Sequence, residues 1–169
     1  MNAPSPKPFF RLLYRLSMPG SRVNEDEAGL RGRFAWVIDG ATGVADEHLT
    51  SGGSDAAWLA GLMNSRLLEQ SDHKEADEVL SSLEASVAGA FASATAHLPE
   101  IHDHHAPSAC LGLIGAAPGE GGRIGLEGRF LGDVIALVPS QDGVVRWTDE
   151  RARRLLEDVT ACGPLAPVA

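Results

Sequence analysis

Acidic side chains follow a strongly apolar run near the start of the chain. Residues 33–43 read RFAWVIDGATG, so that apolar residues on both sides of the chain lead directly to Asp39 and Gly40. Such a run predicts a strand that is covered on both faces. A carboxylate at its end needs a partner, because an ionised group taken out of water is costly unless it is paired or bound to a cation. The glycine allows a sharp turn and leaves its carbonyl free to face a ligand.

A second acidic group lies just upstream of this run. Glu25 and Asp26 follow Asn24, and Arg22 precedes them. Carboxylate oxygens suit a hard cation such as Mg²⁺ or Mn²⁺. A guanidinium group offers a planar pair of donors to a phosphate. Two acidic strand ends and one arginine therefore indicate a divalent metal site that handles a phosphate.

Each of these signals also has a purely structural interpretation. Asp39 and Gly40 alone are typical of a capped turn at a strand end, Arg22 of a solvated loop, and Asp133 of a hairpin turn. Residues 102–105 read HDHH, and imidazole and carboxylate groups are zinc ligands. No second ligand group at a fitted spacing accompanies this run, so we interpret it as a polar loop. A zinc protein built on it is a third alternative.

Composition limits the classes of partner. The chain has 169 residues, which favours one domain with a real core, and 44% of them are hydrophobic. The net charge of −9 argues against nucleic acid and against an anionic membrane as partners. Cys110 and Cys162 share no close spacing, and the apolar run around Cys110 predicts a buried thiol and a reducing compartment. Without a signal-peptide core or a membrane span, we expect a cytoplasmic protein.

Hydrophobic periodicity predicts strands, two helices, a meander of strands and a final helix. Residues 1–8 contain three prolines and should be a flexible tail ahead of one domain over residues 9–169. We expect strands at 9–17, 28–39 (one strand or two), 108–116, 123–131, 134–139 and 144–148. Helices are expected at 54–69, with Ser54 or a neighbour as N-cap, at 75–98 and at 149–158. The short link between the first two helices implies an antiparallel pair. This order is typical of an α+β protein, with a helical layer on an antiparallel sheet.

Five segments resemble, in order, segments of the magnesium- or manganese-dependent PP2C-type protein phosphatases. They are residues 18–26 (MPGSRVNED), 36–43 (WVIDGATG), 54–58 (SDAAW), 107–110 (PSAC) and 130–133 (FLGD). The resemblance is to the bacterial branch, with DGATG where many relatives have DGH. It implies two antiparallel sheets in a sandwich, flanked by antiparallel helix pairs.

The resemblance also implies roles for single residues. Asp39 would bridge two catalytic metals, Mn²⁺ or Mg²⁺, and the Gly40 carbonyl would bind one of them. Glu25 and Asp26 would hold metal-bound waters. Asp133 matches the Gly-Asp turn that can hold a third, weaker metal.

The activity implied is hydrolysis of phosphoserine and phosphothreonine esters of a phosphoprotein substrate, by a water that two metals activate. Arg22 would clamp the substrate phosphate, although the spacing from this arginine to Glu25 is one residue shorter than in the common form. Many relatives have a histidine two residues after the bridging aspartate. Here that residue is Ala41, so a general acid must come from elsewhere.

The resemblance ends after Asp133. The family has two further aspartates that hold the second metal, whereas Asp142 falls in an expected hairpin turn and the later carboxylates in an expected helix. The match thus covers the first two-thirds of a family domain, which implies either a truncated sequence or the loss of one metal position. A phosphatase and a non-catalytic phosphatase-like module that binds a partner or phosphopeptide therefore both remain open. Neither the substrate protein nor the oligomeric state follows from the sequence.

Overall fold

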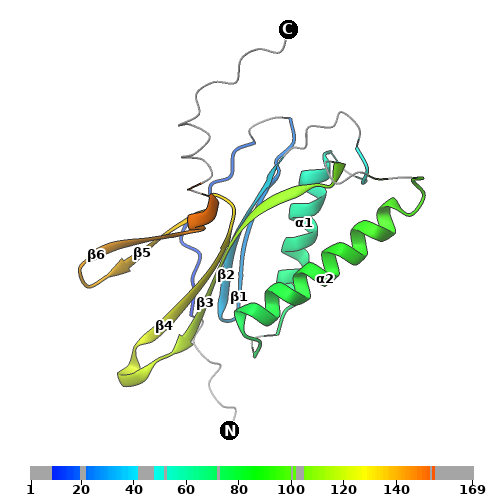
Figure 1. The fold of residues 1–169 in the computed structure, drawn as a ribbon. Coiled ribbons are helices and arrows are strands. Elements are labelled where there is room, and N and C mark those ends of the chain that lie inside the picture. Colours follow the sequence, from blue (N-terminus) through cyan, green and yellow to red (C-terminus); the bar gives the residue numbers. More distant parts are fainter. Residues whose placement is uncertain are drawn as a thin grey trace.

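A computed structural model describes residues 9–19, 22–41, 48–51, 53–71, 73–99, 101, 105–152 and 154. Its elements are β1 (Asp26–Arg31), β2 (Phe34–Ala41), α1 (Asp55–Leu68), α2 (Ala76–Thr95), β3 (Ser108–Pro118), the short 3-10 helix η2 (Glu120–Gly122), β4 (Ile124–Leu131), β5 (Ile135–Ser140) and β6 (Gly143–Thr148). The α+β class is confirmed (Figure 1). The expected tail over residues 1–8, the histidines at 102 and 104, and Cys162 lie outside the described residues.

Four strands form one antiparallel sheet, in the order β1-β2-β3-β4, and β5 and β6 form a separate two-stranded sheet. The region expected as one strand or two is a tight hairpin, in which Gly32 turns the chain between β1 and β2 with a φ of 53°. Glycine adopts this left-handed conformation at no steric cost. The hairpin puts Asp26 directly opposite Asp39, and β3 puts Cys110 on the other side of Asp39.

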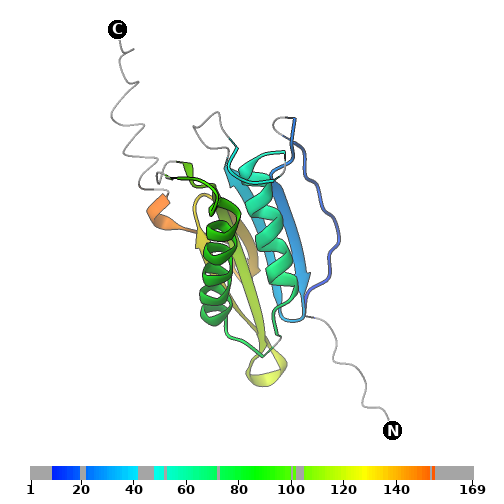
Figure 2. The ribbon, with the colours of Figure 1, turned by 90° about the vertical axis from the view of Figure 1, so that its right-hand side faces the viewer.

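Two helices cover one face of the four-stranded sheet and lie side by side (Figure 2). Ser54 is the N-cap of α1, as expected, and its hydroxyl accepts a hydrogen bond of 3.0 Å from the Ala57 amide. Glu75 opens α2 in a capping box with Glu78. In both cases a side chain satisfies amide groups that lack partners in the first turn of the helix.

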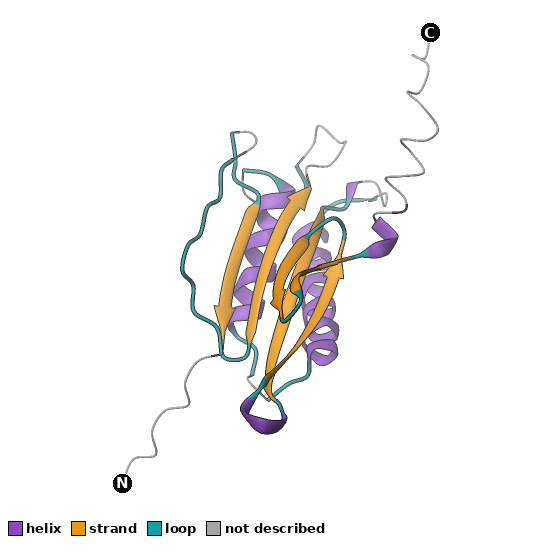
Figure 3. Cartoon of the chain, turned by 90° about the vertical axis from the view of Figure 1, so that its left-hand side faces the viewer, coloured by secondary structure: helices purple, strands orange, loops and turns teal. Residues whose placement is uncertain are grey.

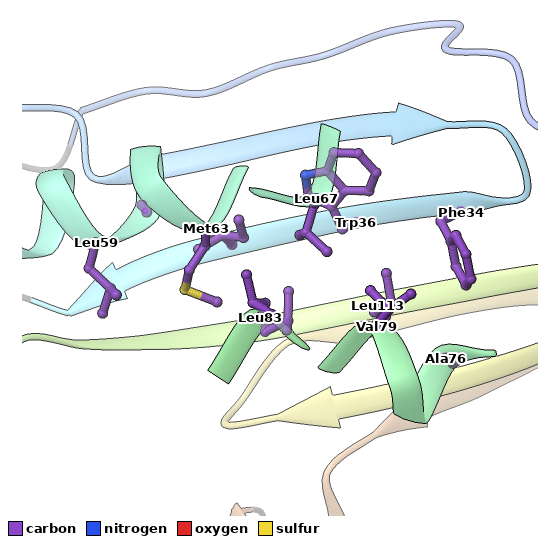
Figure 4. Packing of buried hydrophobic residues seen from close by; sticks show 12 residues of the cluster. Phe34, Trp36, Leu59, Met63, Leu67, Ala76, Val79, Leu83 and Leu113 are labelled. Carbon is purple, nitrogen blue, oxygen red and sulfur yellow. The ribbon is translucent and has the colours of Figure 1, made fainter. Parts of the chain in front are cut away.

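The core lies between these helices and the sheet (Figure 4). Alternate residues of β2 point into it and are buried: Phe34, Trp36 and Ile38. The Trp36 indole nitrogen donates to Asn64 Oδ1 of α1 at 2.9 Å, so its polar end is satisfied. The other members of the cluster come from α1, α2 and β3: Leu59, Ala60, Met63, Leu67, Ala76, Val79, Leu83, Leu111 and Leu113.

The second face of the sheet differs from the expectation. Residues 33–39 predict a strand covered on both faces, but the Val37 side chain is 45% exposed. We call this face, which is turned away from α1 and α2, the open face. The β5–β6 hairpin lies on this side (Figure 3). Trp147 of β6 lies against β4, where a Cβ at Gly128 would meet its ring, and Val134, just before β5, lies against β3, where a Cβ at Gly112 would meet it. The apolar residues around Val37 are therefore a half-covered face, and the described residues do not form a sandwich.

At the two ends of the domain, one expected element is absent and the other is described only in part. The strand predicted at residues 9–17 is wrong: this segment contains no strand and runs along the outer edge of β1 (Figure 3). The sequence alternates there, with Phe10, Leu12, Tyr14 and Leu16 on one side and Arg11, Arg15 and Ser17 on the other, as in a strand, but the segment does not join the sheet beside β1. The predicted final helix is helical at residues 150–152 and 154, and its remainder lies outside the described residues. Within the described chain, no helix is both long enough and apolar enough to cross a bilayer.

Candidate acidic site at the end of the open face

The antiparallel register brings the expected acidic residues to one end of the sheet. Asp26 and Asp39 are direct partners on neighbouring strands, and their side chains therefore point to the same face. Asp39 shares that face with Val37, so both carboxylates belong to the open face. Like charges placed directly opposite each other are destabilising. The strand register thus places two carboxylates directly opposite each other. No basic residue takes part in this register pair.

Glu25 joins this end of the sheet from the other side. Its carboxylate accepts a hydrogen bond of 2.6 Å from the Ser54 hydroxyl, and its carbonyl accepts one of 3.0 Å from the Gly40 amide. Ser54 is buried and also caps α1. Glu25 therefore connects the acidic end of the sheet to the start of the helix. Sequence analysis placed Ser54 at the cap but missed this contact, because nothing in the spacing relates residue 54 to residue 25.

The backbone at Gly40 is closely enclosed by other backbone atoms. A Cβ at this position would lie 2.8 Å from the Glu25 carbonyl oxygen and 2.9 Å from that of Ala56. Both neighbours are backbone atoms that cannot move aside. Glycine is therefore required here by close packing of β2 against the start of α1, and the expected ligand role of its carbonyl is not tested by this packing.

Asp133 reaches the same end through the turn after β4. Gly132, with a φ of 82°, lies against Cys110, since a Cβ there would overlap the Cys110 sulfur. Cys110 is itself the register partner of Asp39. The turn therefore brings the Asp133 charge close enough to act on both groups. Cys110 is half-buried rather than buried as predicted.

The described residues whose charges act on Asp39 are carboxylates. Loss of solvent raises the pKa of the Asp39 carboxyl, and the Asp26 charge, a hydrogen bond to the Asp26 side chain, and the charges of Asp133 and Glu25 raise it further. Partial burial likewise raises the pKa of the Cys110 thiol, and Asp133 and Asp39 add to this. A thiol with a raised pKa is a weak nucleophile at neutral pH. The electrostatic character of this end of the sheet is therefore an excess of negative charge.

Within the described parts of the chain, Asp26 makes hydrogen bonds with a hydroxyl group and with an amide side chain, and with no basic side chain. Ser17 lies 3.4 Å from an Asp26 oxygen and 3.2 Å from Asn24 Oδ1, and the Asp26 amide donates to Asn24 at 3.3 Å. Arg22 is exposed, and among the described residues its guanidinium has no hydrogen-bond or ion-pair partner. Arg22, the residue predicted to bind the substrate phosphate, is thus available in the loop before Glu25, although no contact within the described residues links it to Asp39.

The chemical groups at the acidic end suit a metal ion, but within the described residues their arrangement does not form a complete binding site. Carboxylate oxygens and a backbone carbonyl are the ligands that hard cations take. However, the part of the chain that the structure describes holds no group of three or more His, Cys, Asp or Glu side chains close enough to bind a metal. Most of the HDHH run, the basis of the zinc alternative, falls outside that part.

Among the described carboxylates after Asp133, neither Asp142 nor Asp149 lies at the acidic end as a further ligand. Asp142 lies in the β5–β6 turn, as expected. Asp149 is taken by Arg151, whose guanidinium donates to both carboxylate oxygens at 3.0 Å and lowers the pKa of Asp149 to about 2. It follows that Asp149 already has a cation partner.

An apolar groove extends from the acidic end along the open face. It has a volume of about 380 Å³, and its floor includes Val37, Gly112 and Phe130. The residues that flank it come from the segment before β1 and from the start of β5. Val37 lines the groove two residues before Asp39 on the same face, so the groove begins beside the acidic end, but none of its lining residues is acidic.

Comparison of the chain with protein-family models, with curated proteins and with solved structures found no match.

Proposed function

We propose that this chain is a metal-dependent phosphoprotein phosphatase of the PP2C type, or the part of one that carries Asp39. It would hydrolyse phosphoserine and phosphothreonine esters. One observation carries the proposal: the charges acting on Asp39 from the described residues are those of three other carboxylates. Such a group is stabilised when a divalent cation balances it.

The residues suited to hold such an ion are Asp39, Asp26 and the Gly40 carbonyl, with Glu25 on the helix side and Asp133 on the turn. Because no three acidic side chains of the described residues converge closely, water would have to complete the coordination shell, as it commonly does around Mg²⁺. When bound, a pair of such ions supplies hydroxide at neutral pH and neutralises the phosphoryl oxygens.

The chain's own contributions are binding and orientation. Arg22, exposed and unpaired within the described residues, can offer two parallel donors to a phosphate. Asp39 is held in place by its strand position between Asp26 and Cys110. Ala41 supplies no proton, so the proton for the leaving group comes from another group or from water.

The proposal includes a sandwich fold. The β5–β6 hairpin already contacts the open face at Gly112 and Gly128, and it would be the start of a second sheet. Further strands laid over Val37 and the groove floor would bury the apolar surface that this face now exposes.

The test is calorimetric titration with Mn²⁺, followed by hydrolysis of a phosphothreonine peptide. The wild-type chain is expected to bind Mn²⁺ weakly, because no three acidic side chains of the described residues converge closely enough to hold an ion. Asp39→Asn should abolish that binding, whereas the matched control Asp142→Asn, which removes the same charge from an exposed turn, should retain it. Equal Mn²⁺ binding by wild type and Asp39→Asn would overturn the metal site.

A non-catalytic phosphatase-like module is the second candidate. It is favoured by the lack of a three-residue acidic group in the described chain. Turnover of the phosphopeptide, abolished by Asp39→Asn, would support the enzyme. If the chain binds the phosphopeptide in an Arg22-dependent manner with no turnover in Mn²⁺, the binding module is the correct function. We expect turnover of this chain well below the rate of about 1 per second of an ordinary enzyme.

A further inference from the structure

The segment of residues 9–19, which we call the N-terminal segment, places large apolar side chains in solvent. Leu13 and Tyr14 are 78% and 77% exposed, and Leu12, Leu16 and Met18 are 61–71% exposed. Large apolar side chains in a soluble domain are usually covered, and a contiguous group of them marks an interaction surface. Ser17 of this segment contacts Asp26, but the exposed apolar side chains are not part of the acidic site, and the inference does not rest on the proposed function.

The N-terminal segment is attached to the sheet through a few polar side chains. Arg15 donates to the Ala28 carbonyl at 3.1 Å and pairs with Glu27 at 3.2 Å, and Ser17 contacts Asn24. The segment is not a strand of the sheet, so β1 does not bury it by backbone pairing. It runs along the outer edge of the molecule beside β1 (Figures 1 and 3). Its apolar side chains are therefore available to a partner without unfolding the core.

Charge is distributed very unevenly between this region and the remainder. Four of the 14 lysines and arginines, and none of the 23 acidic residues, precede Glu25. The first 24 residues thus have a charge of +4 inside a chain of −9. Arg11 is exposed, Arg15 is partly exposed, and Lys7 lies outside the described residues. A basic, apolar stretch attached to an acidic domain points to an anionic and apolar partner.

We propose that the N-terminal segment binds the surface of a membrane that contains anionic lipids. Leucine, methionine and tyrosine side chains would enter the boundary between headgroups and acyl chains, while the exposed Arg11 pairs with a lipid phosphate. Residues 9–19 contain both the exposed apolar side chains and the positive charge that such binding requires. The net charge of −9, which argued against a membrane, describes the acidic body of the domain; that body would stay away from the lipid surface.

Other partners fit these residues less well. A nucleic acid would use the arginines but would leave the exposed leucines in water. A second copy of the chain would cover the leucines but would bring two segments of like charge together. An anionic lipid surface satisfies both the charge and the apolar side chains.

The first experiment separates the apolar contribution. The full chain is sedimented with vesicles of 70% phosphatidylcholine and 30% phosphatidylglycerol. Wild type should pellet with the vesicles, and the double variant Leu13→Ser/Tyr14→Ser should bind about tenfold more weakly, or worse. The matched control is Leu137→Ser/Val144→Ser, which removes two similarly exposed apolar side chains from the β5–β6 hairpin. The control should bind like wild type.

The second experiment separates the charge contribution. Each basic residue near an anionic surface is expected to change the binding constant about fivefold. Arg11→Gln should therefore bind about fivefold more weakly. Arg123→Gln removes the same charge just before β4, on the opposite edge of the sheet from β1, and should bind like wild type. Binding should also fall in 0.5 M salt and on pure phosphatidylcholine, because exposed charges are screened.

Several results would overturn the inference. These are wild type that stays in the supernatant, equal binding to neutral vesicles, or loss of binding in the hairpin control. Self-association of wild type that Leu13→Ser/Tyr14→Ser abolishes, without vesicle binding, would assign the segment to a second copy instead. Binding of a DNA oligonucleotide without vesicle binding would assign it to nucleic acid. Thermal unfolding identical to wild type establishes that each variant is folded.

Discussion

The two faces of the four-stranded sheet are built from the same strands but have opposite environments. On the helix side, Phe34, Trp36 and Ile38 are 2–3% exposed. On the open face, Val37 between two of them is 45% exposed, and Asp39 follows it at the acidic end. The alternation of a strand separates residues that stabilise the domain from residues that face a ligand, a groove or a partner.

This comparison teaches where stability and function lie. The helix side is a closed core with satisfied helix N-caps and a hydrogen-bonded indole. The open face has an acidic end, an apolar groove and the N-terminal segment at its edge. Substitutions on the two faces should therefore have different consequences.

The largest difference is expected from shortening an apolar side chain on each face. Leu113 is fully buried, so Leu113→Ala should lower the free energy of unfolding by about 3 kcal/mol through lost burial and a cavity. Val37→Ala on the open face should cost less than about 1 kcal/mol. Urea unfolding followed by circular dichroism measures both. Equal losses would mean that Val37 is covered in solution, by further chain or by a second molecule.

Adding a methyl group at a glycine tests packing on each face. Gly40→Ala would meet two backbone oxygens on the helix side and should cost about 2 kcal/mol. Gly112→Ala meets the Val134 side chain at 2.7 Å, and this side chain can shift away from the open face. It should therefore cost clearly less than Gly40→Ala in the same unfolding measurement. The opposite order would show that the hairpin holds Val134 rigidly against β3.

The smallest differences concern two aspartates whose pKa values shift in opposite directions. The pKa of Asp39 is raised above 3.8, so the folded state holds this proton more tightly than the unfolded state does. Stability then decreases as pH rises through the folded pKa of Asp39. Asp39→Asn should therefore unfold at a higher temperature than wild type at pH 7, and this gain should vanish below pH 3.8.

Asp55, on the helix side, provides the contrast. Partial burial acts to raise its pKa, but hydrogen bonds from the Leu49 amide and from the amide and hydroxyl of Thr50 lower it overall. Its contribution to stability is then complete above pH 3.8 and is lost as pH falls through the folded pKa. Asp55→Asn should lower stability by about 1 kcal/mol at pH 7. A gain in stability for Asp55→Asn, or a loss for Asp39→Asn, would contradict this account.

Local signals were sufficient for most of the secondary structure. Ser54 as a cap, the apolar periodicity of the two helices and the glycine turns each act within a few residues, so the pattern and the structure agree closely. The strand expected at residues 9–17 failed because an apolar run does not specify whether a neighbouring strand is available to pair with it. At the acidic site, the sequence indicated Glu25, Asp26, Asp39, Gly40 and Asp133 as a group.

The sequence by itself determined which residue types lie at strand ends, and hence the excess of carboxylates. The tertiary structure alone decided how they face one another, because register is a relation between strands. It put Asp26 opposite Asp39, turned Glu25 towards Ser54, and brought Asp133 over Cys110. It also decided that Val37 is exposed while Ile38 is buried, since burial depends on what packs against a face, and the helices pack against one face of this sheet.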